Sequence, residues 1–293
     1  MEMRINRSSP RNALKFFSSI LLTFTVIGCT SLELSPVTEP ATYTHQPGKI
    51  VWHDLLTHDV ESAKKFYGEL LGWTFRENGD YHIIQLNGRP IGGIVEIKPK
   101  SQRSIARWIT SLSVDDVDKS AEYTLKQGGK IHEGPVDMRL RGRGALVSDP
   151  LGAKILLLHS SSGDPEDRPA TMNDWLWDEL WSSNPDNSLK FYSTLVGYTS
   201  QEMREGYWIL KSQDKWRSGI RSLFDKELEQ RWVPVIRVEN PQQLSVNIEK
   251  LGGSVLIATG ESATDSQTAL LADPAGALFM IQHWSGLSVE EGK

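Results

Sequence analysis

Two acidic residues lie beside tryptophans at equivalent places in this chain. Asp54 follows Trp52 by two residues, and Glu179 follows Trp177 in the same way. Because side chains alternate along a β-strand, residues two positions apart point to the same face. A carboxylate between indole rings can act as a general base or bind the hydrogen-bond donors of a ligand. We therefore take Asp54 and Glu179 as candidate catalytic residues, with a purely structural acid–arginine pair as the alternative.

These two sites belong to an internal repeat. Trp52 and Trp177 are 125 residues apart, and matched residues continue at a spacing of 124 or 125 as far as His159 and His283. So many matches between uncommon residue types at almost one spacing indicate a duplication. The folded part is therefore expected to contain two related halves, residues 49–160 and 172–285.

Each half divides again into two segments with a common pattern: a short apolar strand, an Asp or Asn, an amphipathic stretch and a glycine. The Asp or Asn side chain can cap a helix by accepting from its first free N–H groups, and glycine permits the left-handed residue that ends it. Short β-rich runs follow each helix, so the predicted fold class is α+β, with the order βαβββ repeated four times. The predicted caps are Asp59, Asp116, Asn184 and Asn240, and the predicted ends are Gly72, Gly128, Gly197 and Gly252.

Several motifs together resemble a known family. They are the repeated βαβββ order, the segment from His58 to Tyr67, the closing Leu71-Gly72-Trp73, and the Asp-Pro-x-Gly-Ala turns at 149–153 and 273–277. This combination resembles the vicinal oxygen chelate superfamily, the glyoxalase, bleomycin-resistance and extradiol dioxygenase group. The resemblance covers about residues 48–285 and is greatest to a two-domain hydroxylase-like branch. It implies two glyoxalase-like domains, each a pair of modules whose curved mixed sheets enclose a cavity.

Enzymes of this superfamily usually hold a divalent metal with histidine and glutamate side chains that face the cavity. None of the residues at the matched positions can supply an imidazole or a carboxylate. We therefore expect no family-type metal and no other cofactor, with a divalent metal at a relocated site as the alternative. The matched positions are Trp52, Trp177, Ile109, Val233, Leu156 and Met280.

The same match implies which other side chains face the cavity. Trp108 and Trp232 fall on the opposite, helix-facing side and are expected in the core. For Trp52 and Trp177, a plain core role is the alternative, and Arg107 or Arg231 is the expected partner if either acid is only structural. The candidate ligand-binding residues are Trp52, Arg107, Ser111, Trp177, Trp181, Arg231 and Arg237.

Composition and charge narrow the possible functions. Hydrophobic residues are 39% and charged residues 24% of the chain, as in packed globular proteins. With a net charge of −5, the protein has no overall positive electrostatic field that would attract nucleic acid. The basic cluster Arg139, Arg141 and Arg143 is interpreted as a solvated loop, with closure over an anionic ligand as the alternative. A single cysteine excludes internal disulfides and four-cysteine metal sites.

The N-terminus is typical of a bacterial lipoprotein. Basic residues precede an apolar run, Phe16 to Ile27, that is too short to span a bilayer and ends at Gly28-Cys29. We interpret residues 1–28 as a signal peptide, Cys29 as the lipidation site and residues 29–48 as a tether. Residues 161–171 are expected to form a linker and 286–293 a tail. The expected location is the cell envelope, on the periplasmic face of the outer membrane if the source is Gram-negative.

Three hypotheses follow, and whether the protein is an enzyme stays open. The first is a lipid-anchored protein that binds a small hydrophobic or aromatic molecule without the family metal. The second is a lyase, isomerase or dioxygenase that uses a relocated metal or acid–base chemistry at Asp54 and Glu179. The third is a non-enzymatic envelope protein that binds a partner through its surface.

Overall fold

Helix starts follow the predicted capping residues. The computed structural model describes residues 33–98, 106–224, 228–260 and 267–285. Asp59, Asp116, Asn184 and Asn240 each accept a hydrogen bond from the backbone N–H three residues later. The four helices are α1 (Val60–Leu71), α2 (Val117–Lys126), α3 (Pro185–Val196) and α4 (Pro241–Ile248).

The helix ends are more varied than their starts. Gly72 and Gly197 take the left-handed conformation, with φ of 70° and 72°, and end α1 and α3 as predicted. Helix α2 ends one residue earlier than predicted, at Gln127. Helix α4 passes into a short 3₁₀ helix, η2 (Glu249–Leu251), before it reaches Gly252. None of the helices in the described ranges is long and apolar enough to cross a membrane.

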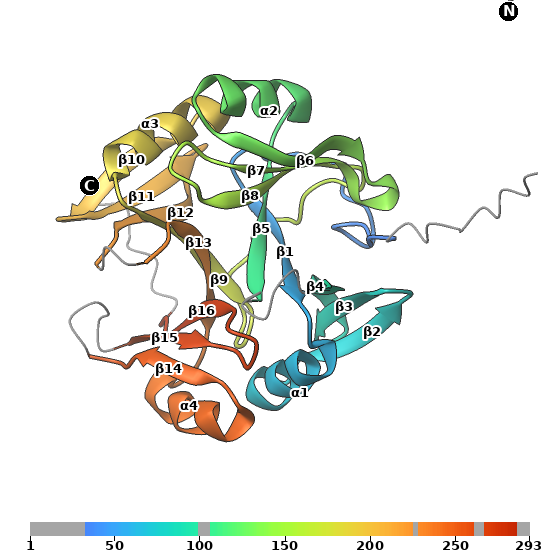
Figure 1. Cartoon of the computed structure of the whole chain (residues 1–293), viewed down its shortest axis with the longest axis vertical. Helices are drawn as coiled ribbons and strands as arrows, with labels where there is room; N and C mark the ends of the chain where they lie inside the picture. Colours follow the sequence, from blue (N-terminus) through green and yellow to red (C-terminus); the bar gives the residue numbers. More distant parts are fainter. Residues whose placement is uncertain (1–32, 99–105, 225–227, 261–266, 286–293) are drawn as a thin grey trace, which may run out of the picture. The chain divides into compact units, whose positions relative to one another are not determined.

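Each half forms one eight-stranded sheet (Figure 1). The first sheet has the order β2-β3-β4-β1-β5-β8-β7-β6, and the second has the order β10-β11-β12-β9-β13-β16-β15-β14. The strands of the first sheet are β1 (Ile50–Thr57), β2 (Thr74–Asn78), β3 (Tyr81–Leu86), β4 (Arg89–Glu96), β5 (Arg107–Ser113), β6 (Lys130–Asp137), β7 (Gly142–Ser148) and β8 (Lys154–Ser160). Those of the second are β9 (Trp175–Ser182), β10 (Thr199–Arg204), β11 (Tyr207–Ser212), β12 (Lys215–Ser222), β13 (Arg231–Arg237), β14 (Ser254–Ile257), β15 (Thr268–Ala272) and β16 (Leu278–Gln282).

The strand pairing confirms the predicted fold class. In each sheet the first strands of two modules pair antiparallel at the centre, β1 with β5 and β9 with β13. Each of these strands then pairs in parallel with the last strand of its own module, as β1 does with β4 and β5 with β8. The result is four βαβββ modules combined into two mixed sheets.

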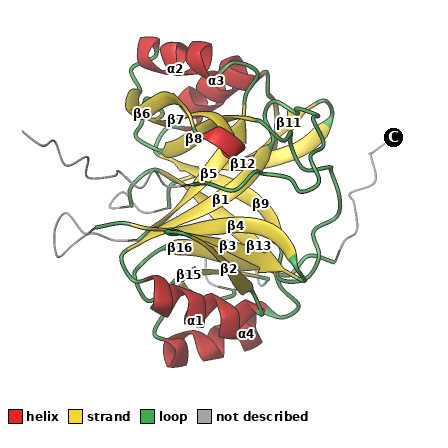
Figure 2. Cartoon of the chain, turned by 90° about the vertical axis from the view of Figure 1, so that its right-hand side faces the viewer, coloured by secondary structure: helices red, strands yellow, loops and turns green. Residues whose placement is uncertain are grey.

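The helices place the hydrophobic cores between the two halves. Helix α1 of the first half lies beside α4 of the second, and α2 lies beside α3, at opposite ends of the sheets (Figure 2). One core cluster accordingly combines Phe66 of α1 with Phe279 of β16, and another combines Leu112 of β5 with Phe191 of α3. The two halves therefore share their cores, since each helix is covered by a helix of the other half.

Two reciprocal contacts reinforce this packing. The hydroxyl of Tyr67 on α1 donates to Asp273, and the hydroxyl of Tyr192 on α3 donates to Asp149. Burial raises the pKa of both aspartates. Each tyrosine oxygen also accepts from a core indole, Trp108 or Trp232, as the expected core placement of these tryptophans requires. The motif Asp-Pro-x-Gly-Ala therefore contributes a buried cross-half contact as well as a turn.

Residues 33–48 were expected to belong to a tether, but in the structure they pack on the folded domain. We call this segment the strap. Ser35 and Val37 are buried, and Val37 packs against Val51 and Trp52 of β1. The backbone N–H groups of Thr42 and Tyr43 donate to the carbonyl of Ser162. Scattered apolar residues and free backbone donors find partners on the folded domain, so this stretch packs despite its tether-like composition. The predicted signal peptide and Cys29 lie outside the described residues.

Candidate functional site

Asp54 lies in a closed network on the first sheet. Its Oδ1 accepts hydrogen bonds from the Tyr81 hydroxyl at 2.6 Å and from Trp52 Nε1 at 3.1 Å, and its Oδ2 accepts from Arg141 Nη1 at 3.2 Å. The guanidinium of Arg141 is fully buried and lies 4.5 Å from the centre of the Trp52 ring. Burial raises the pKa of Tyr81. The strap covers this network, because Arg141 also donates to the carbonyl of Ser35.

Glu179 lies in an equivalent but more open network on the second sheet. Arg221 donates to both carboxylate oxygens, at 2.9 and 3.1 Å, and the Tyr207 hydroxyl donates at 3.0 Å. The Arg221 guanidinium lies 5.1 Å from the centre of the Tyr207 ring. Burial raises the pKa of Tyr207 as it does that of Tyr81. Both acids are therefore held by one tyrosine and one arginine.

The arginine partners are not the predicted ones. Arg141 comes from the turn before β7, and Arg221 comes from β12. Arg107 is exposed, and Arg231 donates to Glu229 instead. Strand register explains the difference, because Arg107 pairs opposite Leu56, two positions beyond Asp54. The interpretation of Arg141 as part of a solvated loop is also wrong, since it is fully buried beneath the strap.

The two tyrosines were missed, although the sequence contains a signal for them. Tyr81 and Tyr207 begin equivalent strands, and glycines Gly93 and Gly219 lie in the adjacent strands. A Cβ at Gly93 would overlap the Tyr81 hydroxyl, and one at Gly219 would lie 3.0 Å from the Tyr207 hydroxyl. A tyrosine and a glycine repeated together at one spacing thus indicate a ring laid across a neighbouring strand.

A cavity of about 980 Å³ adjoins the second network. Strands of both sheets, the strap and the linker contribute to its wall. Three of the predicted site residues line it, namely Trp52, Trp177 and Glu179. Further lining residues are His53, Trp175, Asp178, Tyr207, Trp216 and Arg221.

The remaining predicted site residues lie elsewhere among the described residues. Asp54 is enclosed by its network, Ser111 is buried in β5, and the Trp181 ring packs 5.2 Å from Phe224. Arg237 donates to the carbonyl of Ala170 at 2.6 Å. Arg107 and Arg231 stand at the starts of β5 and β13.

The charges on the cavity wall are largely paired. Asp167 of the linker binds Lys49 at 2.7 Å, Lys215 at 2.7 Å and Arg217 at 2.6 Å. Burial alone would raise the pKa of Asp167, but the hydrogen bonds from these three cations hold it well below its usual range. Nearby, Asp174 binds Arg89 at 2.6 Å. The linker is therefore fastened by ion pairs at the cavity wall.

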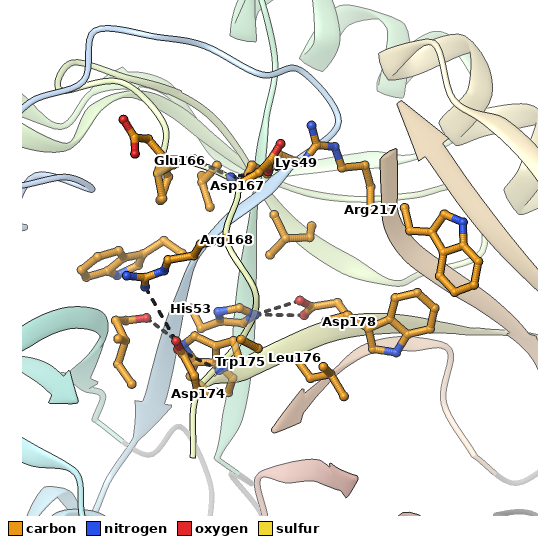
Figure 3. A pocket seen from close by; sticks show the side chains of 18 of the residues that line it. Lys49, His53, Glu166, Asp167, Arg168, Asp174, Trp175, Leu176, Asp178 and Arg217 are labelled. Carbon is orange, nitrogen blue, oxygen red and sulfur yellow. Dashed lines mark hydrogen bonds and ion pairs between the residues drawn. The ribbon is translucent and has the colours of Figure 1, made fainter. Parts of the chain in front are cut away.

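The centre of the cavity wall carries a histidine–aspartate pair (Figure 3). His53 Nε2 lies 3.0 Å from both carboxylate oxygens of Asp178. The Thr110 hydroxyl donates to the same carboxylate at 2.9 Å. The His53 ring stacks on Trp175 with a centroid distance of 4.1 Å. Neither residue belongs to the candidate set predicted from the sequence, because both lie on the strand face opposite to the one that carries Asp54 and Glu179.

The residues at the family's metal positions do not fit a divalent cation. Trp52 uses its only polar atom to donate to Asp54 and Tyr81, and the other matched positions are occupied by an indole or by aliphatic and thioether side chains. Across the described part of the chain, no three His, Cys, Asp or Glu side chains lie close enough to hold a metal ion.

Comparisons with known proteins agree with this fold. Residues 49–157 match the model of the Glyoxalase/Bleomycin resistance protein/Dioxygenase superfamily. The chain is 27% identical over 253 residues to the "Putative glyoxylase CFP32" of Mycobacterium tuberculosis. This match covers 83% of this chain and 97% of that protein. It is 22% identical to the "Anthracycline biosynthesis protein DnrV" of Streptomyces peucetius, over 80% of this chain and 93% of that protein.

Solved structures show the same fold at low sequence identity. The Mn(II)-bound glyoxalase from Novosphingobium aromaticivorans has a TM-score of 0.56 at 13% identity, covering 82% of this chain and 83% of its own. A variant of homoprotocatechuate 2,3-dioxygenase from Brevibacterium fuscum has a TM-score of 0.57 at 12% identity, with coverages of 85% and 74%. Thus the fold is of the glyoxalase and dioxygenase type.

Proposed function

We propose that this protein, whose residues 49–157 match the model of the glyoxalase superfamily, binds a small hydrophobic or aromatic molecule without the family metal. The observation that carries the proposal is the cavity of about 980 Å³ with aromatic rings on its wall. Small-molecule sites are typically concave, mostly apolar and about 300–1,000 Å³ in volume, with a few polar groups that orient the ligand. The cavity lies within this volume range, and its wall combines aromatic rings with charged groups that are largely paired with one another.

The nature of the wall favours a flat ligand. Trp177 lies 6.4 Å from Tyr207 and 6.4 Å from Trp216, measured between ring centres. Aromatic faces at these positions suit stacked or edge-on contacts with a second ring system. The relative named for anthracycline biosynthesis points the same way, since anthracyclines contain fused aromatic rings.

A lipid anchor at Cys29 is the second part of the proposal. The basic and apolar N-terminal sequence supports it, and the strap begins only a few residues later at Glu33. An acylated Cys29 would hold the folded domain close to a membrane of the cell envelope.

An enzyme of the same superfamily is the second candidate. The observation in its favour is that Glu179 lines the cavity, where its carboxylate could accept a proton from a bound molecule. Arg221 and Tyr207 already bind this carboxylate, which favours a positioning role. Asp54 is less suited to catalysis because its network is closed by Arg141 and the strap. The surface-binding hypothesis gains least support, since a cavity of ligand size adjoins Glu179.

Quenching of tryptophan fluorescence by a panel of aromatic compounds tests the binding function. We expect saturable quenching together with a rise in melting temperature. Trp216→Ala should weaken binding by about two- to tenfold, the loss expected when one aromatic contact worth about 0.5–1.5 kcal/mol is removed. Phe224→Ala is the matched control, because Phe224 is an exposed aromatic side chain outside the cavity lining. Equal weakening by both substitutions, or no saturable quenching, would reject the proposal.

Metal content separates the binder from a metalloenzyme. We expect less than one equivalent of zinc, nickel, manganese or iron in purified protein, before and after each metal is added back. One tightly held equivalent would contradict the metal-free proposal and make the enzyme hypothesis the leading one.

A further inference from the structure

We propose that His53 and Asp178 form a proton-accepting pair in the cavity, with His53 Nδ1 as the atom that receives a proton from an aromatic hydroxyl compound. This inference rests on the proposed binding function and specifies the chemical class of its ligand. It concerns a pair of residues separate from the two acids bound by arginine.

The pair is buried and oriented by several neighbours. His53 and Asp178 are 4% and 1% exposed, and both line the cavity. The carboxylate holds Nε2 from one side, while Trp175 stacks on one face of the imidazole ring. Figure 3 shows the histidine between Trp175 and Asp178 at the cavity wall. The ring is therefore fixed in position before any ligand arrives.

The hydrogen bonds determine which nitrogen carries the proton. Asp178 accepts from Thr110 and lies at 3.0 Å from Nε2, so Nε2 must carry a hydrogen to donate. His53 Nδ1 is buried and has no hydrogen-bond partner among the described residues. A buried N–H on a charged ring without an acceptor costs more than an unused lone pair. The hydrogen-bond geometry therefore favours hydrogen on Nε2 and a lone pair on Nδ1.

An unused acceptor of this kind suits a ligand that supplies a hydrogen-bond donor. Buried polar atoms in proteins are nearly always paired, so an orphan nitrogen on a side chain that lines the cavity indicates a missing partner. Trp175 stacks on the His53 ring, and Trp177 also lines the cavity. A phenolic hydroxyl supplies the donor, and its ring matches the aromatic wall.

The proposed proton transfer is balanced within the pair. The O–H bond of the phenol breaks, an N–H bond forms at Nδ1, and the electron pair stays on oxygen as phenolate. The resulting imidazolium is stabilised by the carboxylate of Asp178, which itself keeps no added proton. This arrangement needs no metal, oxidant or further reactant.

The His53–Asp178 pair breaks the symmetry of the internal repeat. His53 and Asp178 occupy equivalent positions of the two halves, 125 residues apart, and they meet where β1 faces β9. A buried ion pair can often be replaced by apolar residues without loss of stability. The fold alone therefore does not require a histidine and an acid at this place.

Nitrogen NMR of the histidines tests the protonation state directly. We expect hydrogen on His53 Nε2 and none on Nδ1, and we expect Asp178→Asn to disturb this arrangement. Asp118→Asn is the matched control, because Asp118 binds Arg143 on the surface. An imidazolium or a hydrogen on Nδ1 in the free protein would overturn the proposal and leave an ordinary structural ion pair.

A pair of probes tests the ligand class. 4-Nitrophenol changes its absorbance when it becomes phenolate, whereas 4-nitroanisole has the same ring but no hydroxyl. We expect saturable binding of 4-nitrophenol, with phenolate formed below the pH at which the free probe ionises. His53→Gln should remove the phenolate signal and weaken 4-nitrophenol binding by about tenfold, as losing one hydrogen bond of about 1.4 kcal/mol does. It should leave 4-nitroanisole binding unchanged, and the control His132→Gln should alter neither probe.

The outcomes separate this inference from the function on which it rests. Saturable quenching by 4-nitrophenol without any phenolate signal would overturn the His53–Asp178 proposal and leave the binding function standing. Failure of both probes and of the wider aromatic panel to bind would overturn both. Equal weakening of both probes by His53→Gln would assign the histidine a packing role only.

Discussion

Arg141 and Arg221 show how similar side-chain networks respond to different burial. Both arginines bind an acid that follows a tryptophan by two residues, and both lie over a tyrosine ring. The Arg141 side chain is 0% exposed, while that of Arg221 is 15% exposed and lines the cavity. Water can therefore replace Arg221 more readily than Arg141.

Substitution of the two arginines should have unequal effects on stability. Arg141→Ala should lower the free energy of unfolding by about 3–5 kcal/mol, because Asp54 would remain as a buried carboxylate without its cation. Arg221→Ala should cost clearly less, since Glu179 can be hydrated from the cavity. Urea denaturation of the two variants measures both values. The double variant Asp54→Asn/Arg141→Met leaves no unpaired buried carboxylate, so it should be more stable than Arg141→Ala. Equal losses of stability for Arg141→Ala and Arg221→Ala would contradict the comparison.

The strap is the element whose structure departs most from the sequence prediction. Its composition is polar and lacks periodicity, yet Val37 enters a cluster with Val51, Trp52 and Leu158. The strap is also tied to the linker, because the Asp164 carboxylate accepts from the backbone N–H of Gln46. Two non-repetitive segments thus hold each other against the first sheet.

A charge in the strap core should release the strap selectively. Val37→Asp would bury an unpaired carboxylate, so the strap should detach while the two sheets stay folded. Amide hydrogen exchange at Thr42 and Tyr43 should accelerate at least about tenfold, the change that a loss of 1.4 kcal/mol of local stability produces. Thr44→Asp, at an exposed strap position, is the control and should leave exchange unchanged. Acceleration throughout the sheets would instead show that the strap is required for the whole fold.

At the scale of the whole molecule, specific contacts join the two halves. The helices pack across the halves, and two tyrosine–aspartate contacts repeat this exchange symmetrically. The linker adds an ion-pair cluster in which Asp167 joins Lys49 beside β1 to Lys215 and Arg217 of β12. Because these contacts bridge the duplicated halves, we expect the two halves to unfold together.

The Asp167 cluster should make part of the stability depend on pH. Its folded pKa lies below the ordinary value of 3.8, so its stabilisation is present above that value and is lost as pH falls through the folded pKa. The stability difference between the wild type and Asp167→Asn should therefore be constant near neutral pH and shrink below about pH 4. Denaturation curves at several pH values measure it. Asp80→Asn, at an exposed position in the turn before β3, is the control. A difference that grows in acid would contradict the assignment.

Local chemistry made much of the fold predictable. Asp59 and Asn184 cap helices by bonding to backbone three residues away, so their roles depend on neighbours in the sequence. The repeat spacing identified equivalent strands, and alternation correctly placed Trp52 and Asp54 on one face, where they form a hydrogen bond. The roles proposed for the nine candidate site residues stay predictions, although three of them line the cavity.

What the sequence by itself determined is the α+β class, the four modules and the common face of Trp52 and Asp54, because period, caps and turns are short-range properties. Only the tertiary structure decided that Arg141 and Arg221 are the partners of the acids, that the strap is packed, and that His53 meets Asp178. Each of these depends on how separate elements approach in space. Pairing across sheets and halves follows from burial and geometry, and no local pattern in the chain records it.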